Sequence, residues 1–165
     1  MSPVSYAKEN ALVDSVWALA HLDDPNVRFV EVDVDTTAYE QSHLPGAVGW
    51  NWTSQLADGI RRDIASREEF ERLLRTSGID RDTTIVLYGD NNNWFAAWAF
   101  WQLKVYGHQD VRIMDGGRKK WLAEGKELST DPPAAAKKTY KAKAPDNSLR
   151  AFLPEVQDAV KGKKA

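Results

Sequence analysis

Hydrophobic positions along this chain come in short runs of two kinds, and the two kinds alternate. β-Branched apolar runs bounded by turn residues predict four strands, at 27–33, 48–51, 83–88 and 111–114. Apolar residues spaced as on one face of a helix predict four helices, at 14–22, 66–76, 94–105 and around Trp121. This alternation predicts an α/β fold with a mainly parallel sheet, and right-handed crossovers then place helices on both of its faces.

Residues at the ends of these segments support the assignments. Ser66, followed three residues later by Glu69, forms a capping box, and Gly78 is placed to end the helix that begins there. The run at 83–88 is apolar over most of its length, which is typical of a strand covered on both faces. We therefore expect this strand to be buried within the sheet.

The character of the sequence changes after the last of these helices. Residues 129–148 are rich in proline, alanine and lysine, which indicates a linker that lies along a surface. After it, Pro154 marks the start of a new helix, in which Val156 and Val160 repeat the apolar spacing of the first predicted helix. We expect a domain at 1–128, a linker at 129–148 and, at 149–165, the first helix of a second copy of the fold.

Composition narrows the chemistry that is available. The 165 residues carry a net charge of −2 with both signs interspersed, so neither nucleic acid nor a membrane is an expected partner. No apolar run approaches the length of a membrane span and no signal peptide is visible, which favours a cytoplasmic location. The sequence contains no cysteine, which excludes disulfides, thiolate metal sites and a cysteine nucleophile within it. We expect no metal and no cofactor.

Three motifs follow one another along the chain. His-Leu-Pro-Gly-Ala stands at 43–47, Tyr-Gly-His at 106–108, and Asp-Gly-Gly at 115–117 is followed by Trp121 and Gly125. In this order and spacing they resemble the signatures of the rhodanese family, and the similarity covers about 13–128. The resemblance implies a rhodanese-like three-layer fold. Because the linker and last helix are similar to the junction in tandem rhodaneses, the chain resembles the non-catalytic N-terminal domain of a two-domain thiosulfate sulfurtransferase.

The resemblance also implies where catalysis would occur. In catalytic rhodanese domains the central strand ends in a cysteine, and backbone N–H groups of the next loop surround its sulfur. Here the strand runs into Gly89-Asp90-Asn91-Asn92-Asn93, and either Gly89 or Asp90 stands at the position of the cysteine. Neither can form a persulfide, and a carboxylate at Asp90 would repel an anion such as thiosulfate. We interpret the loop as a degenerate polar turn, with Asn92 or Asn93 as N-cap of the next helix, rather than as a metal or phosphate site.

A second departure from the family pattern follows the first predicted strand. The family often has Asp-x-Arg there, and then a Glu just ahead of an aromatic residue. This chain keeps Asp33 and Tyr39 but has Asp35 and Ala38 where the Arg and Glu would be. Loss of both members of an ion pair costs less than loss of one, so this pattern is typical of a settled non-catalytic domain.

In tandem rhodaneses the active site lies between the two halves. The resemblance therefore implies that Trp94 and Phe95, beside the degenerate loop, pack against a C-terminal rhodanese domain and wall its cleft, with Asp35 at the same rim. An apolar wall would exclude water and limit hydrolysis of a persulfide. The alternative is that both aromatic residues are core residues of an amphipathic helix.

Three functions remain open. The first is a scaffold half of a thiosulfate sulfurtransferase, which transfers sulfane sulfur from thiosulfate to cyanide or another thiophile. Its catalytic cysteine is then expected in a C-terminal domain missing here, and this chain alone is expected to be inactive. The second is a free-standing, inactive rhodanese-like module for protein binding or regulation. The third is an enzyme of another chemistry, such as the phosphatases that share this fold, which also depend on a cysteine. The linker and last helix favour the first, since a complete module does not need them.

Overall fold

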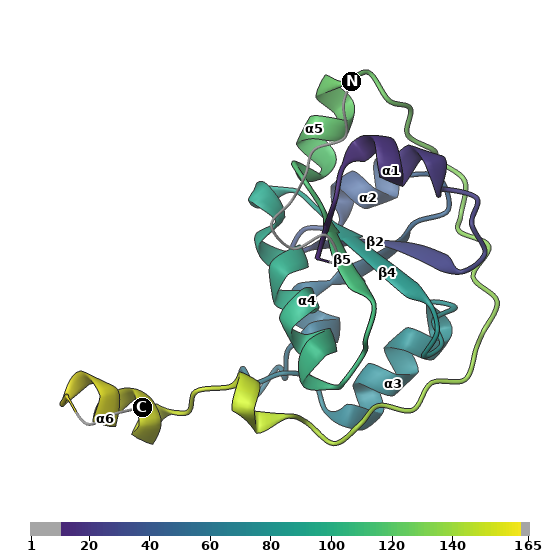
Figure 1. Cartoon of the computed structure of the whole chain (residues 1–165). Coiled ribbons are helices and arrows are strands. Elements are labelled where there is room, and N and C mark those ends of the chain that lie inside the picture. The colour runs from purple at the N-terminus through teal and green to yellow at the C-terminus, as the bar shows by residue number, and fades with distance from the viewer. Residues whose placement is uncertain (1–10, 163–165) are drawn as a thin grey trace.

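The computed structural model describes residues 11–162. They form a five-stranded parallel sheet with the strand order β1-β5-β4-β2-β3 (Figure 1). The strands are Leu12–Val13 (β1), Val27–Asp33 (β2), Val48–Asn51 (β3), Thr84–Tyr88 (β4) and Val111–Met114 (β5). The expected α/β class is confirmed, and the apolar run at 84–88 is the central strand.

Helices cover both faces of this sheet. The α-helices are Ser15–Ala20 (α1), Thr37–Gln41 (α2), Arg67–Thr76 (α3), Trp94–Val105 (α4), Gly117–Ala123 (α5) and Leu153–Val160 (α6). Three shorter turns complete the described elements: the π-helical turn Trp52–Leu56 (η1) and the 3-10 turns Asn91–Asn93 (η2) and Asn147–Leu149 (η3).

The strands divide the apolar core into two clusters, because successive side chains of a strand point to opposite faces. On β4, Ile85 and Leu87 pack with α3 and α4, whereas Val86 and Tyr88 pack with α1 and α5. The α3/α4 cluster is the larger of the two, and it also contains Tyr140 from the segment after α5. The central strand is therefore covered on both faces, as its composition predicts.

Capping groups mark the ends of α1 and α3. The Asp14 carboxylate accepts a hydrogen bond from the Trp17 N–H at 2.7 Å and begins α1. Ser66 and Glu69 form the expected capping box of α3. Gly78 follows that helix with a φ of 69°, a backbone conformation that glycine adopts without a steric penalty.

The sequence does not predict β1, α2, η1 or η3, the last of which lies at the end of the predicted linker. β1 has two residues, too few for an alternating pattern, and is defined by its pairing with β5. α2 buries no side chain and therefore lacks an apolar stripe. η1 lies in a segment whose composition indicates a polar loop. β1 and η1 depend on contacts with distant parts of the chain, which sequence periodicity does not report.

The chain leaves the body of the domain along its surface and ends in α6. Figure 1 shows this last helix projecting away from the sheet and from the other helices. Its apolar side chains Leu153, Val156 and Val160 are exposed. The helix predicted after Pro154 is thus present, while its membership of a second domain stays a prediction. Among residues 11–162, no helix has the length and apolar character needed to cross a membrane.

Candidate functional site

The loop after β4 lies at the carboxyl edge of the sheet, which is where α/β proteins commonly bind ligands. Gly89 is buried and Asp90 is half-buried. Asn91, Asn92 and Asn93 then adopt φ angles of 51°, 57° and 61°. Asparagine tolerates this left-handed conformation better than most residues other than glycine. The asparagines therefore allow the chain to turn tightly from β4 into α4.

Gly89 has no room for a side chain. A Cβ atom there would lie 2.5 Å from the Val32 carbonyl oxygen and 3.2 Å from Asp33 Oδ1. Its own carbonyl oxygen accepts a hydrogen bond from the Arg118 N–H at 3.2 Å. The space beside the first residue after the central strand is therefore filled by β2.

Asn93 holds the loop closed. It is the N-cap residue of α4 by position, as one of the two predicted alternatives states, but its side chain does not cap the helix. Its Oδ1 accepts from the Gly89 N–H at 3.0 Å, and its Nδ2 donates to the Met114 carbonyl at 2.9 Å. This side chain thus ties the loop to the end of β5.

A buried ion pair lies beneath the loop. Arg118 donates from Nη1 to both carboxylate oxygens of Glu31 at 3.0 Å, and both side chains are buried. Its Nη2 donates to the Ala38 carbonyl and to Ser42 Oγ, each at 3.2 Å. The sequence analysis missed this pair, because nothing in the spacing of residues 31 and 118 connects them. Arg118 directly follows the Asp-Gly-Gly motif, which was the one local signal for it.

Asp33 is a second buried carboxyl group beside this pair. It is 4% exposed, and its two oxygens accept from the Asp90 N–H at 3.1 and 3.3 Å. Burial, together with the nearby Glu31 and Asp90 carboxylates, raises the pKa of Asp33 to about 7. The loop is therefore packed against a carboxyl group that gains a proton near neutral pH. The Gly89 and Asp90 N–H groups are thus bonded to Asn93 and Asp33, so these two donors are not available to a thiolate or a bound anion.

The three predicted interface residues have different environments. Trp94 is 71% exposed at the start of α4. Phe95 is half-buried, with its ring centroid 5.4 Å from that of Trp52. Asp35 is exposed, and its carboxylate accepts hydrogen bonds from the N–H and hydroxyl groups of Thr37. The core-residue alternative thus applies in part to Phe95 and not to Trp94.

Comparison with known proteins identifies the family and the fold of the chain. Residues 14–124 match the model of the rhodanese-like domain. The chain belongs to the rhodanese family. The solved structure of the Escherichia coli 3-mercaptopyruvate sulfotransferase SseA has the same fold, with a TM-score of 0.78 at 22% identity over 93% of this chain and 63% of SseA.

Curated relatives of this rhodanese domain are longer than the chain. A protein of Saccharopolyspora erythraea described as "Putative thiosulfate sulfurtransferase" is 51% identical over 95% of the chain and 56% of its own length. A protein of Haloferax volcanii with the same description is 48% identical over 97% of the chain and 57% of its own length. The chain therefore spans about half the length of these relatives.

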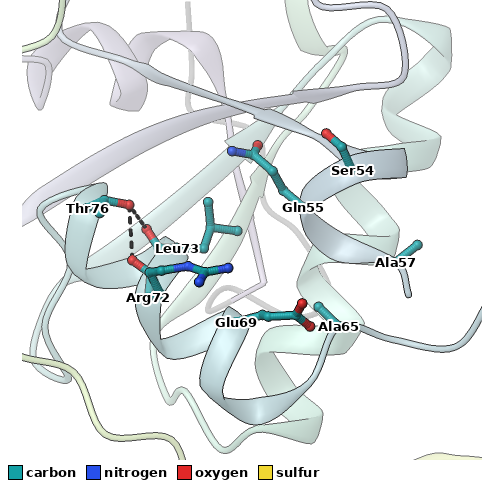
Figure 2. Close-up of a pocket in the computed structure, with 8 residues that line it drawn as sticks. All are labelled: Ser54, Gln55, Ala57, Ala65, Glu69, Arg72, Leu73 and Thr76. Atoms are coloured by element: carbon teal, nitrogen blue, oxygen red, sulfur yellow. Dashed lines mark hydrogen bonds between the residues drawn. The ribbon is translucent and has the colours of Figure 1, made fainter. Parts of the chain in front are cut away.

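Two further features bear on what this rhodanese domain can bind. Among residues 11–162, no group of three or more His, Cys, Asp or Glu side chains is arranged to hold a metal ion. A cavity of about 210 Å³ lies between η1 and α3, lined by Ser54, Gln55, Ala57, Ala65, Glu69, Arg72, Leu73 and Thr76 (Figure 2). None of its lining residues belongs to the loop at 89–93. The cavity is thus separate from the place where rhodanese chemistry is expected.

Proposed function

We propose that this chain is the non-catalytic N-terminal half of a thiosulfate sulfurtransferase. The observation that carries the proposal is the loop after β4, in which Gly89 has no space for a side chain because the Val32 carbonyl and the Asp33 carboxyl group of β2 fill the adjoining volume. The absence of cysteine from the sequence and the span of about half of each curated relative support it. The second half would then supply the nucleophile, and we place the whole protein in the cytoplasm.

The proposed reaction takes place on a cysteine of that second half. Its thiolate attacks the outer sulfur of thiosulfate, so the sulfur–sulfur bond of the donor breaks and sulfite leaves with the electron pair. The resulting persulfide then transfers its terminal sulfur to cyanide, which gives thiocyanate and regenerates the thiolate. No group of the present chain forms or breaks a bond in this cycle.

The contribution of this half is a wall of the cleft between the two domains. Trp94 supports this role because a tryptophan 71% exposed on a domain surface is available to be covered by a partner. Phe95 would set the position of this wall through its contact with Trp52, and Asp35 would lie at the rim. An apolar wall would keep water from the persulfide and so favour transfer over hydrolysis.

Activity measurements on the full-length protein and on the 165-residue chain test the proposal. We expect thiosulfate:cyanide sulfurtransferase activity in the full-length protein and none in the chain alone. Trp94→Ala in the full-length protein should increase persulfide hydrolysis relative to sulfur transfer, whereas Thr139→Ala, at an exposed position of the linker, should not. A native protein with the 18.6 kDa mass of this chain would contradict the proposal and indicate a free-standing binding or regulatory module.

A further inference from the structure

The segment that follows α5 is held along its length by the domain. We call residues 131–150 the strap; its residues 132–146 form neither helix nor strand. Backbone N–H groups of the strap donate to Arg75 O, Glu71 Oε1, Tyr106 O and Val105 O, and backbone carbonyls of the strap accept from His43 Nε2, Arg81 Nη1 and Trp101 Nε1. The strap thus has the composition of a flexible linker, but hydrogen bonds hold it against α3, α4 and the loops that contain His43 and Arg81.

The Tyr106-Gly107-His108 motif contacts the strap through all three of its residues. The Tyr106 carbonyl accepts from the Lys143 N–H at 3.1 Å. The space beside the Gly107 Cα is filled by the Lys143 side chain, which a Cβ atom would meet at 2.7 Å. His108 Nδ1 lies 2.9 Å from the hydroxyl oxygen of Tyr140. Gly107 also ends α4 with a φ of 75°, so one turn both closes the helix and receives the strap.

Tyr140 is the buried anchor of the strap. It is 2% exposed and belongs to the larger core cluster. Burial lowers the pKa of His108, so its imidazole is neutral at physiological pH. His108 Nε2 lies 2.8 Å from the Thr83 carbonyl, which only accepts, so Nε2 carries the proton and Nδ1 accepts from the Tyr140 hydroxyl. Each polar atom of this buried pair therefore has a partner.

Arg81 closes the outer side of this contact. Its Nη1 donates to the Lys141 carbonyl at 3.2 Å and its Nη2 to the Gly107 carbonyl at 2.9 Å. Its guanidinium carbon lies 6.0 Å from the centre of the Tyr140 ring. One side chain thus joins the strap to the turn that receives it. We call Arg81, His108 and Tyr140 the clasp.

We propose that the clasp fixes the point from which the second half of the protein begins, and that its residues are positioning residues for sulfur transfer. This inference rests on the function proposed above. The strap remains attached beyond the core, because Trp101 Nε1 donates to the Leu149 carbonyl at 2.7 Å and Arg150 pairs with Asp63 at 2.5 Å. If the strap served only to fill the core with Tyr140, these last two contacts, at Leu149 and Arg150, would not be needed.

The physical advantage of a fixed strap is a restricted starting position. A flexible linker of about 20 residues has an end-to-end distance that varies around roughly 25 Å. The second half would then sample many orientations, only a few of which place its nucleophile against Trp94. A strap that is bonded up to Arg150 removes most of this freedom, which raises the effective concentration of the two halves for each other.

Amide hydrogen exchange on the 165-residue chain tests the clasp itself. The Ala142, Lys143 and Asp146 amides donate to Glu71 Oε1, Tyr106 O and Val105 O. Arg81→Gln and Tyr140→Phe should each accelerate exchange of these three amides by roughly tenfold, since each removes a hydrogen bond that fixes the strap beside them. Thr139→Ala is the matched control at an exposed strap position and should leave these rates unchanged. Unchanged exchange in both clasp variants would show that the strap is held without the clasp.

A two-residue Gly-Ser insertion after Ala151 in the full-length protein tests positioning. It lies beyond the last strap anchor, so exchange in the strap and thermal stability of the first half should not change. We expect the rate of sulfur transfer to fall several-fold and the fraction of persulfide lost to water to rise. Full activity of the insertion variant would overturn the positioning role. Absence of activity in the unmodified full-length protein would instead overturn the proposed function and leave the exchange result standing.

Discussion

Two clusters of buried polar residues lie at opposite ends of β4, and they differ in charge. At the carboxyl end, Glu31 and Asp33 are both buried, with Arg118 as the neighbouring cation. At the amino end, His108 and Tyr140 form a neutral pair in which each polar atom is bonded. A buried excess of negative charge makes stability fall as pH rises, whereas a buried neutral histidine makes it fall as pH drops. The two ends of one strand thus respond to pH in opposite directions.

The largest effect should come from breaking the ion pair at the carboxyl end. Arg118→Met leaves the Glu31 carboxylate buried without its cation, and we expect the free energy of unfolding to fall by about 3–5 kcal/mol. The double variant Glu31→Gln/Arg118→Met should recover much of this loss, because no unpaired charge remains. Urea denaturation of the three proteins at pH 7 measures both values. A loss below about 1 kcal/mol in Arg118→Met would show that the pair does not matter for stability.

Asp33→Asn should raise stability in a way that depends on pH. The pKa of Asp33 is about 7 in the fold, against 3.8 for the group in an unfolded chain. Protonated Asp33 therefore makes its full contribution to stability below about pH 4, and this contribution is lost as pH rises through 7. We expect Asp33→Asn to stabilise the protein by at most about 4 kcal/mol at pH 8, because it removes a buried charge while Asn still accepts from the Asp90 N–H. The gain should shrink steadily toward pH 4, because Asp33 itself is then protonated and uncharged.

Asp35→Asn is the matched control for this pH series. Asp35 is exposed, and hydrogen bonds from Thr37 lower its pKa. A lowered folded pKa contributes stability above the unfolded pKa, so its small pH dependence has the opposite sign to that of Asp33. Unfolding curves at pH 4, 6 and 8 for both variants provide the comparison. A pH-independent Asp33→Asn difference would contradict a raised pKa for Asp33.

Tyr140→Phe should have a smaller effect, at the amino end of β4. It leaves His108 Nδ1 without its donor, and we expect a loss of about 1–2 kcal/mol at pH 8. Because burial lowers the pKa of His108, stability from its neutral form is present above the unfolded value of 6.5 and is lost as pH falls through the folded pKa. Thermal unfolding at pH 8 and pH 5 measures both effects. Equal stability of the two proteins at pH 8 would refute the hydrogen bond between Tyr140 and His108.

Trp94→Ala should change the stability of this domain least. The side chain is 71% exposed, so its removal should alter the free energy of unfolding by no more than about 0.5 kcal/mol. Phe95→Ala is the comparison, and it should cost more because Phe95 packs against Trp52. Denaturation of the isolated chain measures the difference. A larger loss in Trp94→Ala than in Phe95→Ala would make Trp94 a core residue and remove its proposed role as a cleft wall.

The sequence predicted those elements whose signals lie within a single segment of the chain, and it missed those that depend on distant residues. The apolar run at 84–88 and the capping box at Ser66 predicted β4 and α3, because both signals act within one element. β1 could not be predicted, since its two residues become a strand only through pairing with β5. The polar loop was correctly expected after β4, and so was Asn93 as a possible N-cap. The use of its side chain to join Gly89 to Met114 could not be inferred, because Met114 lies 21 positions further along the chain, at the end of the neighbouring strand β5.

By itself, the sequence determined the α/β class, the family resemblance and the absence of a cysteine nucleophile from these 165 residues, since each depends on residues that are identified where they stand. Only the tertiary structure decided how the loop after β4 is packed. The Val32 carbonyl and the Asp33 carboxyl group of β2 fill the space beside Gly89, and Arg118 pairs with Glu31 across 87 positions of the chain. It also decided that the proline-, alanine- and lysine-rich segment is fixed, because Tyr140 and His108 meet across 32 positions. Contacts at such separations follow from how strands and helices pack, and composition carries no record of them.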